Sequence, residues 1–356
     1  MASTLGSSTA PVTAPVTAAP PTEREPRASL ASDPAPKRRR AARTSSSSLG
    51  RARRFARRVH AVEPAAPVPP PLPAGHIINV PGIGEVFARV SDPVPGAVPV
   101  LLLHGWTVSA DLNWFRVYED LAATRQVIAI DHQGHGRGIR SEQPFSLERC
   151  ADAADGVLEQ LGIERAIVAG YSMGGPISLL LAHRHPTRVA GLVLGATSLE
   201  WRAGRLERLQ WRFLPLLELL SRFTTGKGIA QRVVRQAMED DPTLEVWRPW
   251  LVAEMQRGHV PDVLNAGRAL SRYDARPWVD DIEAPASVVL TTQDRLVRPR
   301  KQRQLAKRLH ATTHEIPADH DAPLVLADHF GPALRQAIDD VALHEWAAKT
   351  HLQSIR

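Results

Sequence analysis

The chain has 356 residues, of which 43% are hydrophobic and 23% charged, the balance of an ordinary globular protein. Its single cysteine, Cys150, excludes an intrachain disulfide and a cysteine-based metal cluster, and no apolar run approaches the roughly 18–20 residues that span a bilayer. The formal charge of +7 arises in residues 1–74, which carry +8, whereas residues 75–356 carry −1. Charge therefore does not indicate a nucleic-acid-binding face on the main body, and we expect no nucleic-acid partner.

Residues 1–74 form a Pro/Ala/Arg-rich basic tail that we predict to be disordered. They contain 13 of the 30 prolines, and such a segment cannot bury enough apolar surface to offset its ordering entropy. The arginine cluster at 51–58 favours peripheral contact with an anionic membrane, and a simply solvated tail is the alternative. Because the N-terminus lacks the apolar core of a secretion signal, the expected location is cytoplasmic, with membrane association through this basic segment as an option.

From residue 76 onward, short apolar runs alternate with helical stretches. A hairpin is predicted first, because residues 76–80 and 85–90 alternate in polarity around Pro-Gly-Ile-Gly. The later runs are apolar on both faces, which predicts a parallel sheet covered on both sides and a doubly wound α/β fold. The predicted strands are 98–103, 126–130, 166–169, 189–195, 287–292 and 313–316, and the predicted helices are 111–123, 146–161, 173–185, 299–309 and 322–349.

Residues 197–284 interrupt this rhythm. The stretch is helical in character, has no convincing strand pattern and holds five of the eight tryptophans. We therefore predict a helical insertion at 197–284, placed between two strands of one α/β core that comprises residues 75–196 and 285–356.

The sequence Gly170-Tyr171-Ser172-Met173-Gly174 lies between a predicted strand and a predicted helix. This G-x-S-x-G pattern is typical of a sharp turn that lifts a serine hydroxyl above the sheet. Gly170 and Gly174 remove side chains that would clash in such a turn. The helix that begins here directs a partial positive charge at the serine. Ser172 is therefore the candidate nucleophile.

Two backbone N–H groups are the candidate donors to an oxyanion. One belongs to Met173, directly after the serine, and the other to Trp106, in the loop after an earlier predicted strand. The indole of Trp106 is expected at the rim of a substrate pocket, to which we also assign Tyr171, Trp201 and Trp211.

A serine nucleophile needs a general base and an acid that orients the base, and each should follow a strand. Asp294 follows the predicted strand 287–292, and His320 follows the predicted strand 313–316, so neighbouring strand ends would bring the two side chains together. His320 is the best placed of the fourteen histidines. Glu200, which follows an earlier strand, is the reserve candidate for the acid.

Together these motifs resemble those of the α/β-hydrolase superfamily over about residues 76–350. More narrowly, the chain resembles the cap-containing serine esterases and lipase-like hydrolases of actinobacterial type. The resemblance implies an eight-stranded, mostly parallel sheet with a helical cap after the sixth strand, and it implies Ser172, His320 and Asp294 as nucleophile, base and acid. The matching segments are His104-Gly105-Trp106, Asp131-His132-Gln133-Gly134-His135-Gly136, GYSMGG, Asp294 and His320.

The expected function is hydrolysis of a small-molecule carboxylic ester through an acyl-enzyme, without cofactor or metal. The tryptophans of the insertion favour a hydrophobic acyl or alcohol group. Two alternatives stay open. The same triad could act on another bond, as in a carbon–carbon hydrolase, an amidase or a cofactor-free perhydrolase, or the chain could be a non-catalytic interaction protein that uses its basic tail. Ser172 stands where epoxide hydrolases and haloalkane dehalogenases carry an aspartate, which disfavours those two classes.

Overall fold

A computed structural model of the protein describes residues 67–201 and 226–354. These residues belong to one structural unit, Glu63–Arg356. Nearly all of the predicted tail lies outside the described residues, so its disorder and its membrane contact stay predictions. The first strand begins at Ala74, one residue before the predicted start of the core. Within the described ranges, no helix is both long and apolar enough to cross a membrane.

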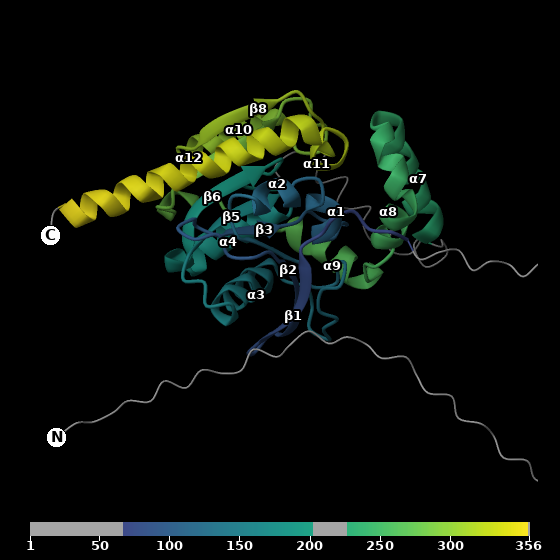
Figure 1. The fold of residues 1–356 in the computed structure, drawn as a ribbon, viewed down its shortest axis with the longest axis horizontal. Coiled ribbons are helices and arrows are strands. Elements are labelled where there is room, and N and C mark those ends of the chain that lie inside the picture. The colour runs from purple at the N-terminus through teal and green to yellow at the C-terminus, as the bar shows by residue number, and fades with distance from the viewer. Residues whose placement is uncertain (1–66, 202–225, 355–356) are drawn as a thin grey trace, which may run out of the picture. The chain divides into compact units, whose positions relative to one another are not determined.

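The centre of the fold is an eight-stranded sheet in the order β1-β2-β4-β3-β5-β6-β7-β8 (Figure 1). β1 pairs antiparallel with β2, as the hairpin prediction requires, and β2 pairs antiparallel with β4, whereas the other neighbours are parallel. The strands β3 to β6 are buried along their whole length, which explains their continuous apolar runs. The predicted fold class is confirmed. The bounds are β1 (Ala74–Val80), β2 (Gly84–Val90), β3 (Val100–Leu103), β4 (Val127–Ile130), β5 (Ala166–Tyr171), β6 (Val189–Gly195), β7 (Ala286–Thr291) and β8 (Thr312–Ile316).

Helices cover both faces of this sheet. On one face α3, α4 and α10 contribute side chains such as Leu158 and Ile177 to the core, and on the other face α1, α2 and α12 contribute side chains such as Leu121 and Ile338. The bounds are α1 (Ala110–Trp114), α2 (Tyr118–Ala122), α3 (Leu147–Gln160), α4 (Gly174–Arg184), α10 (Pro299–Arg308), α11 (Ala322–Val325) and α12 (Ala327–Ser354), with a 3-10 turn η1 (Pro186–Arg188) before β6.

Two of the predicted helices are each divided in two. The predicted helix 111–123 becomes α1 and α2, because the chain turns before Val117, whose φ is −120°. The predicted helix 322–349 becomes α11 and α12, with the break at Leu326, whose φ is −131°. Apolar residues continue at helical spacing across both breaks, so the sequence pattern does not reveal them.

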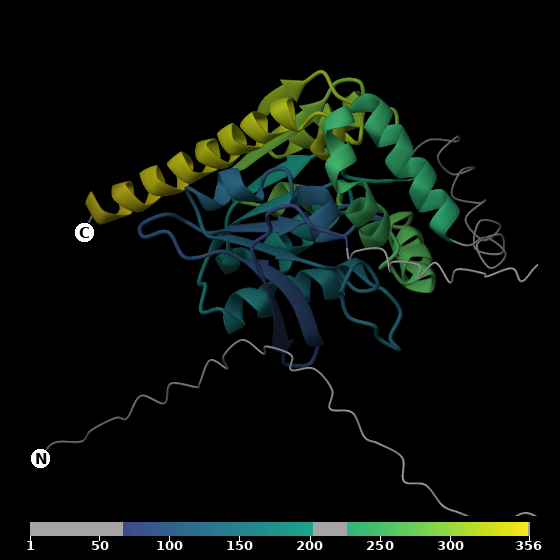
Figure 2. The ribbon, with the colours of Figure 1, turned by 45° about the vertical axis from the view of Figure 1, so that its right-hand side comes forward.

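The part of the insertion that the structure describes is helical. Strand-like pairing in these described residues consists of an isolated antiparallel bridge between Glu200 and Asp274. Figures 1 and 2 both show α7 and α8, in green, beyond one end of the strands and beside α1 and α11. This is the end at which the candidate residues follow β5, β7 and β8. The bounds are α7 (Gly226–Asp240), η2 (Pro242–Trp247), α8 (Arg248–Met255), α9 (Val260–Leu270) and η3 (Val279–Asp281).

Candidate active site

Ser172 occupies a sharp turn between β5 and α4. Its φ of +53° is left-handed, a conformation that costs a residue with a side chain free energy and persists where the surroundings hold it. Two hydrogen bonds do so here. The Ser172 N–H donates to the carbonyl of Gly195 on β6 (2.9 Å), and Thr197 Oγ1 donates to the Ser172 carbonyl (2.8 Å).

The two glycines of the motif allow the chain to pack closely at this turn. A Cβ atom on Gly170 would overlap Ser178 Oγ, and a Cβ atom on Gly174 would overlap the carbonyl oxygen of Leu103. Since the second of these is a backbone atom of β3, it cannot move aside without disturbing the sheet. The turn therefore requires the glycines that the motif supplies.

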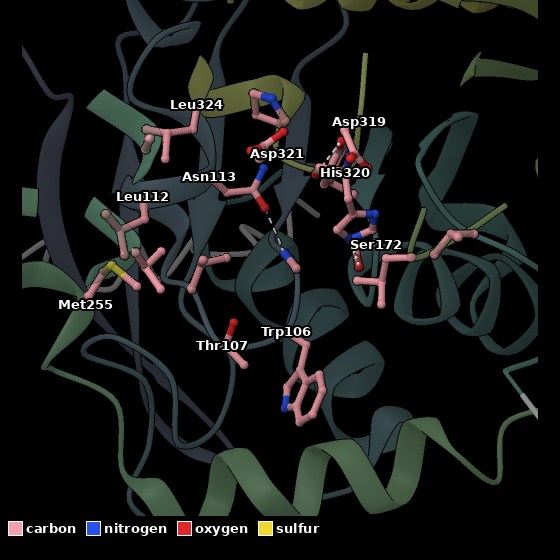
Figure 3. Close-up of a pocket in the computed structure, with 18 of the residues that line it drawn as sticks. Trp106, Thr107, Leu112, Asn113, Ser172, Met255, Asp319, His320, Asp321 and Leu324 are labelled. Atoms are coloured by element: carbon pink, nitrogen blue, oxygen red, sulfur yellow. Dashed lines mark hydrogen bonds between the residues drawn. The ribbon is translucent and has the colours of Figure 1, made fainter. Parts of the chain in front are cut away.

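His320 lies between Ser172 and Asp294, and Figure 3 shows its ring directed at the serine. His320 Nε2 is 2.9 Å from Ser172 Oγ, and His320 Nδ1 is 2.9 Å from Asp294 Oδ2. The structure thus brings together the three residues that the sequence singled out, from loops after β5, β7 and β8. The reserve acid, Glu200, instead forms an ion pair with Lys301 (3.2 Å).

The Asp294 carboxylate is buried and surrounded by donors. Its Oδ1 accepts from the backbone N–H groups of Leu296 (2.9 Å) and Val297 (2.7 Å). Its Oδ2, which faces the imidazole, also accepts from Thr291 Oγ1 (2.9 Å) and lies 3.3 Å from Gln302 Nε2. These bonds fix the orientation of the carboxylate. Thr291 and Gln302 were not among the predicted site residues, because common polar residues on a strand and a helix carry no motif.

The loop that carries His320 is held by Tyr171 and Asp319. Tyr171 Oη donates to the carbonyl of His320 (3.0 Å). Asp319 accepts from the N–H of His320 (2.8 Å) and forms an ion pair with Arg295 (2.6 Å). Burial acts to raise the pKa of Asp319, but the hydrogen bonds from Arg295 and from the His320 N–H, together with the Arg295 charge, outweigh burial and lower that pKa.

The loop after β3 passes directly beside the serine. A Cβ atom on Gly105 would lie 3.3 Å from Ser172 Cβ, and the Gly105 N–H donates to Asn113 Oδ1 on α1 (2.9 Å), the dashed line at the centre of Figure 3. Trp106 is the next residue of this loop. Met173 stands at the N-terminal end of α4, where backbone N–H groups lack an intrahelical acceptor. Both assigned oxyanion donors therefore belong to segments that adjoin Ser172, and their role stays a proposal.

A cavity of about 710 Å³ opens at Ser172 and His320. Trp106 and Trp201 line this cavity together with Tyr171, as the pocket prediction stated, whereas the fourth predicted pocket residue, Trp211, lies outside the described residues. The walls are mainly apolar. The insertion contributes Val233, Val234, Ala237, Leu251, Met255 and Leu270 to them.

Three histidines form a buried cluster that includes the first residue of the loop after β3. The ring centroids of His104 and His132 are 4.3 Å apart, and those of His104 and His135 are 5.4 Å apart. His104 Nδ1–H donates to the Gly105 carbonyl (2.7 Å), and His104 Nε2 accepts from the His132 N–H (3.0 Å). Burial lowers the pKa of His132 to about 3, that of His135 to about 4 and that of His104 in the same direction, so the cluster is neutral at neutral pH. Across the described ranges, no group of three or more ligating side chains is arranged to hold a metal ion.

Fold and site together define the class of protein. The model of the alpha/beta hydrolase fold family matches residues 98–325, which is more than half of the chain, and the chain belongs to that family. The protein is accordingly a hydrolase.

Several known proteins are similar to this chain in sequence or in fold. Pimeloyl-acyl-carrier-protein methyl ester esterase of Neisseria meningitidis (strain Z2491) is 30% identical over 259 residues, which is 70% of this chain and 79% of that protein. The crystal structure of the enol-lactonase from Burkholderia xenovorans LB400 has a TM-score of 0.62 at 22% identity, covering 74% of this chain and 100% of that chain, and it shows the shared fold. The dihydrolipoyllysine-residue acetyltransferase component of the acetoin cleaving system from Pseudomonas putida is 40% identical over 104 residues, or 29% of this chain, and the chain spans only 28% of its length.

Proposed function

We propose that the protein is a serine hydrolase that cleaves a carboxylic ester through an acyl-enzyme. One observation carries this proposal: Ser172 Oγ, His320 and the buried Asp294 form a continuous chain of hydrogen bonds, 2.9 Å at each step, at the opening of an apolar cavity. This is the arrangement by which an otherwise weak hydroxyl nucleophile is activated.

In the proposed mechanism, His320 Nε2 takes the proton of Ser172 as Oγ attacks the acyl carbon. Asp294 keeps the imidazole in the tautomer that carries hydrogen on Nδ1, and it stabilises the imidazolium that forms. The N–H groups of Trp106 and Met173 donate to the oxyanion. The imidazolium then protonates the leaving alcohol, and water activated by His320 releases the acid from the acyl-enzyme.

The cavity supports a hydrophobic acyl or alcohol group. Its walls are mainly apolar, which favours burial of hydrocarbon at roughly 0.8 kcal/mol per methylene. The charged lining residues support the same substrate class. Lys301 is paired with Glu200 (3.2 Å), and two carboxylates, Asp319 and Asp321, border the cavity beside His320, so a substrate carboxylate would meet like charge.

A fluorophosphonate probe tests the nucleophile. We expect the purified protein to be labelled and the Ser172→Ala variant to remain unlabelled, since the probe reacts with activated serine hydroxyls. Thermal unfolding of both proteins serves as the control for folding. A folded wild-type protein that takes up no label would contradict the proposal and favour the interaction-protein alternative.

A series of p-nitrophenyl esters tests the substrate class. With an apolar cavity, kcat/KM should rise from acetate through butyrate to hexanoate, on the order of tenfold for each pair of methylenes. A flat or falling series would contradict the hydrophobic substrate while leaving the serine mechanism intact. Turnover of amides or carbon–carbon substrates in preference to all esters would favour the alternative bond types.

A further inference from the structure

The loop that would supply the oxyanion donor Trp106 is held by contacts outside itself. We name residues 104–109, between β3 and α1, the oxyanion segment. Thr107 within it has a φ of +70°, a left-handed conformation that costs a residue with a side chain on the order of 1 kcal/mol. The segment therefore does not adopt this shape from local preference, and the neighbouring structure must impose it.

Hydrogen bonds from neighbouring elements impose the shape, beginning with the His132 N–H, which donates to His104 Nε2 (3.0 Å). The Gly105 N–H donates to Asn113 Oδ1 on α1 (2.9 Å). Trp106 Nε1 donates to the carbonyl of Val263 on α9 (2.6 Å), and Figure 3 shows the indole directed toward that helix. Ser109 Oγ donates to Glu254 Oε1 on α8 (3.0 Å). The contacts of Trp106 and Ser109 come from the insertion, whereas those of His104 and Gly105 come from the core.

Of the two insertion contacts, only the one at Glu254 is to a charged group, and this residue is fully enclosed. The residue is 2% exposed and does not line the cavity. Arg137, from the loop after β4, donates to both of its oxygens (2.7 and 2.9 Å), and Arg257 Nε donates to Oε2 (2.6 Å). A buried carboxylate with this many donors has one available orientation, so the Ser109 hydroxyl is directed to a fixed point.

Arg137 connects this contact to the remainder of the core. Its guanidinium also lies 3.2 Å from Asp111 in the first turn of α1 and 4.9 Å from the centroid of the Phe87 ring on β2. Asp111 in turn accepts from Arg89 (2.7 Å). The Glu254 carboxylate thus joins the insertion to a charged network that surrounds the start of α1, the element that follows the oxyanion segment.

We propose that Glu254 is a positioning residue that holds the oxyanion segment through Ser109, so that an insertion helix contributes to stabilising the transition state. This inference rests on the proposed ester hydrolysis. Glu254 acts at a distance, because its carboxylate touches Ser109 and two arginines but neither the cavity nor the triad. A simpler structural role, in which Glu254 only attaches α8, would change stability and substrate binding but not the rate of the chemical step.

The variant Glu254→Gln keeps the shape of the side chain and removes its charge. We expect kcat for p-nitrophenyl butyrate to fall about tenfold with KM within about twofold, a part of the 10²–10³-fold that a lost oxyanion donor costs. The matched control is Asp241→Asn, which removes another insertion carboxylate bound to a core arginine, Arg116 (2.8 Å), away from the segment. It should leave kcat unchanged.

Two further measurements distinguish a positioning role of Glu254 from a role in which it only attaches α8. A trifluoromethyl ketone, which forms an oxyanion on Ser172, should bind Glu254→Gln more weakly by the same factor as kcat falls, whereas the product acid should bind equally well. Ser109→Ala breaks the same contact from the core side, together with the N-cap bond that Ser109 Oγ accepts from the Leu112 N–H (3.2 Å), and leaves the Arg137 pairs in place. The double variant should then lose less than the sum of the two single variants, because both weaken the contact between Ser109 and Glu254.

The outcomes distinguish this inference from the proposed function. A wild-type protein without esterase turnover would overturn both. Wild-type turnover with an unchanged kcat in Glu254→Gln, equal weakening of both ligands, or additive losses in the double variant would overturn the positioning role alone. If Glu254→Gln does not fold, Ser109→Ala with the two ligands decides the question by itself.

Discussion

The two walls of the cavity are built from different chemistry. The core wall presents Ser172 and His320 at strand ends, and backbone pairing within the sheet fixes their positions. The insertion wall presents apolar side chains such as Val233 and Leu251, and side-chain contacts such as the pair of Arg137 with Glu254 attach it. Under the proposed function, bond cleavage depends on the core wall and substrate choice on the insertion wall, with Glu254 as the proposed link between them.

The largest effect is expected on the core wall, at Asp294. In Asp294→Asn the amide oxygen can still accept from Leu296 and Val297, which leaves the amide NH₂ facing His320 Nδ1. The imidazole then adopts the tautomer with hydrogen on Nε2 and cannot accept the proton of Ser172. We expect kcat to fall on the order of 10³–10⁴-fold with little change in KM, measured with p-nitrophenyl butyrate.

A second Asp–His pair provides the control for that variant. His314 on β8 lies 3.0 Å from Asp340 on α12, and neither residue contacts the triad in the described structure. Asp340→Asn should therefore retain full turnover. Equal loss in the two variants would show that Asp294 acts through stability, and the distinction between the walls would then fail.

A smaller effect is expected on the insertion wall, at Val233. This side chain lines the cavity and is 44% exposed, so a larger residue can extend into the cavity without overpacking the core. In Val233→Trp, kcat/KM for the octanoate ester should fall about tenfold relative to the acetate ester, since a shortened pocket excludes methylenes. Val246→Trp, at an exposed position on η2 outside the cavity, is the control. An equal loss on both esters would mean that the wall affects catalysis rather than selectivity.

The last prediction, which bears least on turnover, concerns stability in acid and the buried histidine cluster at the loop after β3. His104, His132 and His135 have pKa values below their usual 6.5 in the folded state, so below that pH the unfolded chain binds more protons and folding loses free energy. Asp131 opposes this, because burial raises its pKa to about 6 and its protonation in the folded state favours folding between about 6 and 4. Three groups against one leave the equivalent of two groups, a net loss of roughly 3 kcal/mol per pH unit between about pH 6 and pH 4.

Urea unfolding across this pH range measures the loss. His132→Leu removes one titrating ring whose nitrogens have no hydrogen-bond partner in the described structure, so it should flatten the slope without breaking a side-chain bond. A slope identical to that of the wild-type protein would show that the histidines do not set the acid stability.

The site and the sheet were predictable from the sequence because each leaves a local signal. Buried strands read as continuous apolar runs, and Gly170 to Gly174 mark a turn whose sterics allow few alternatives. The anchors of the insertion leave no such signal. Glu254 and Ser109 are 145 positions apart, and nothing in the periodicity of α8 marks one glutamate as buried and paired with Arg137. The break between α1 and α2 and the break between α11 and α12 were not predicted for a related reason, because tertiary packing sets where they fall.

Trp106 offers a consequence of a spectroscopic kind. Its indole lines the cavity, donates to the carbonyl of Val263 and packs so closely on Gly267 of α9 that a Cβ atom there would overlap the ring. The fluorescence of this one residue thus depends on occupancy of the cavity and on the seating of α9 at once. In a protein with the other seven tryptophans replaced by phenylalanine, its emission would report insertion displacement in real time, without any attached dye.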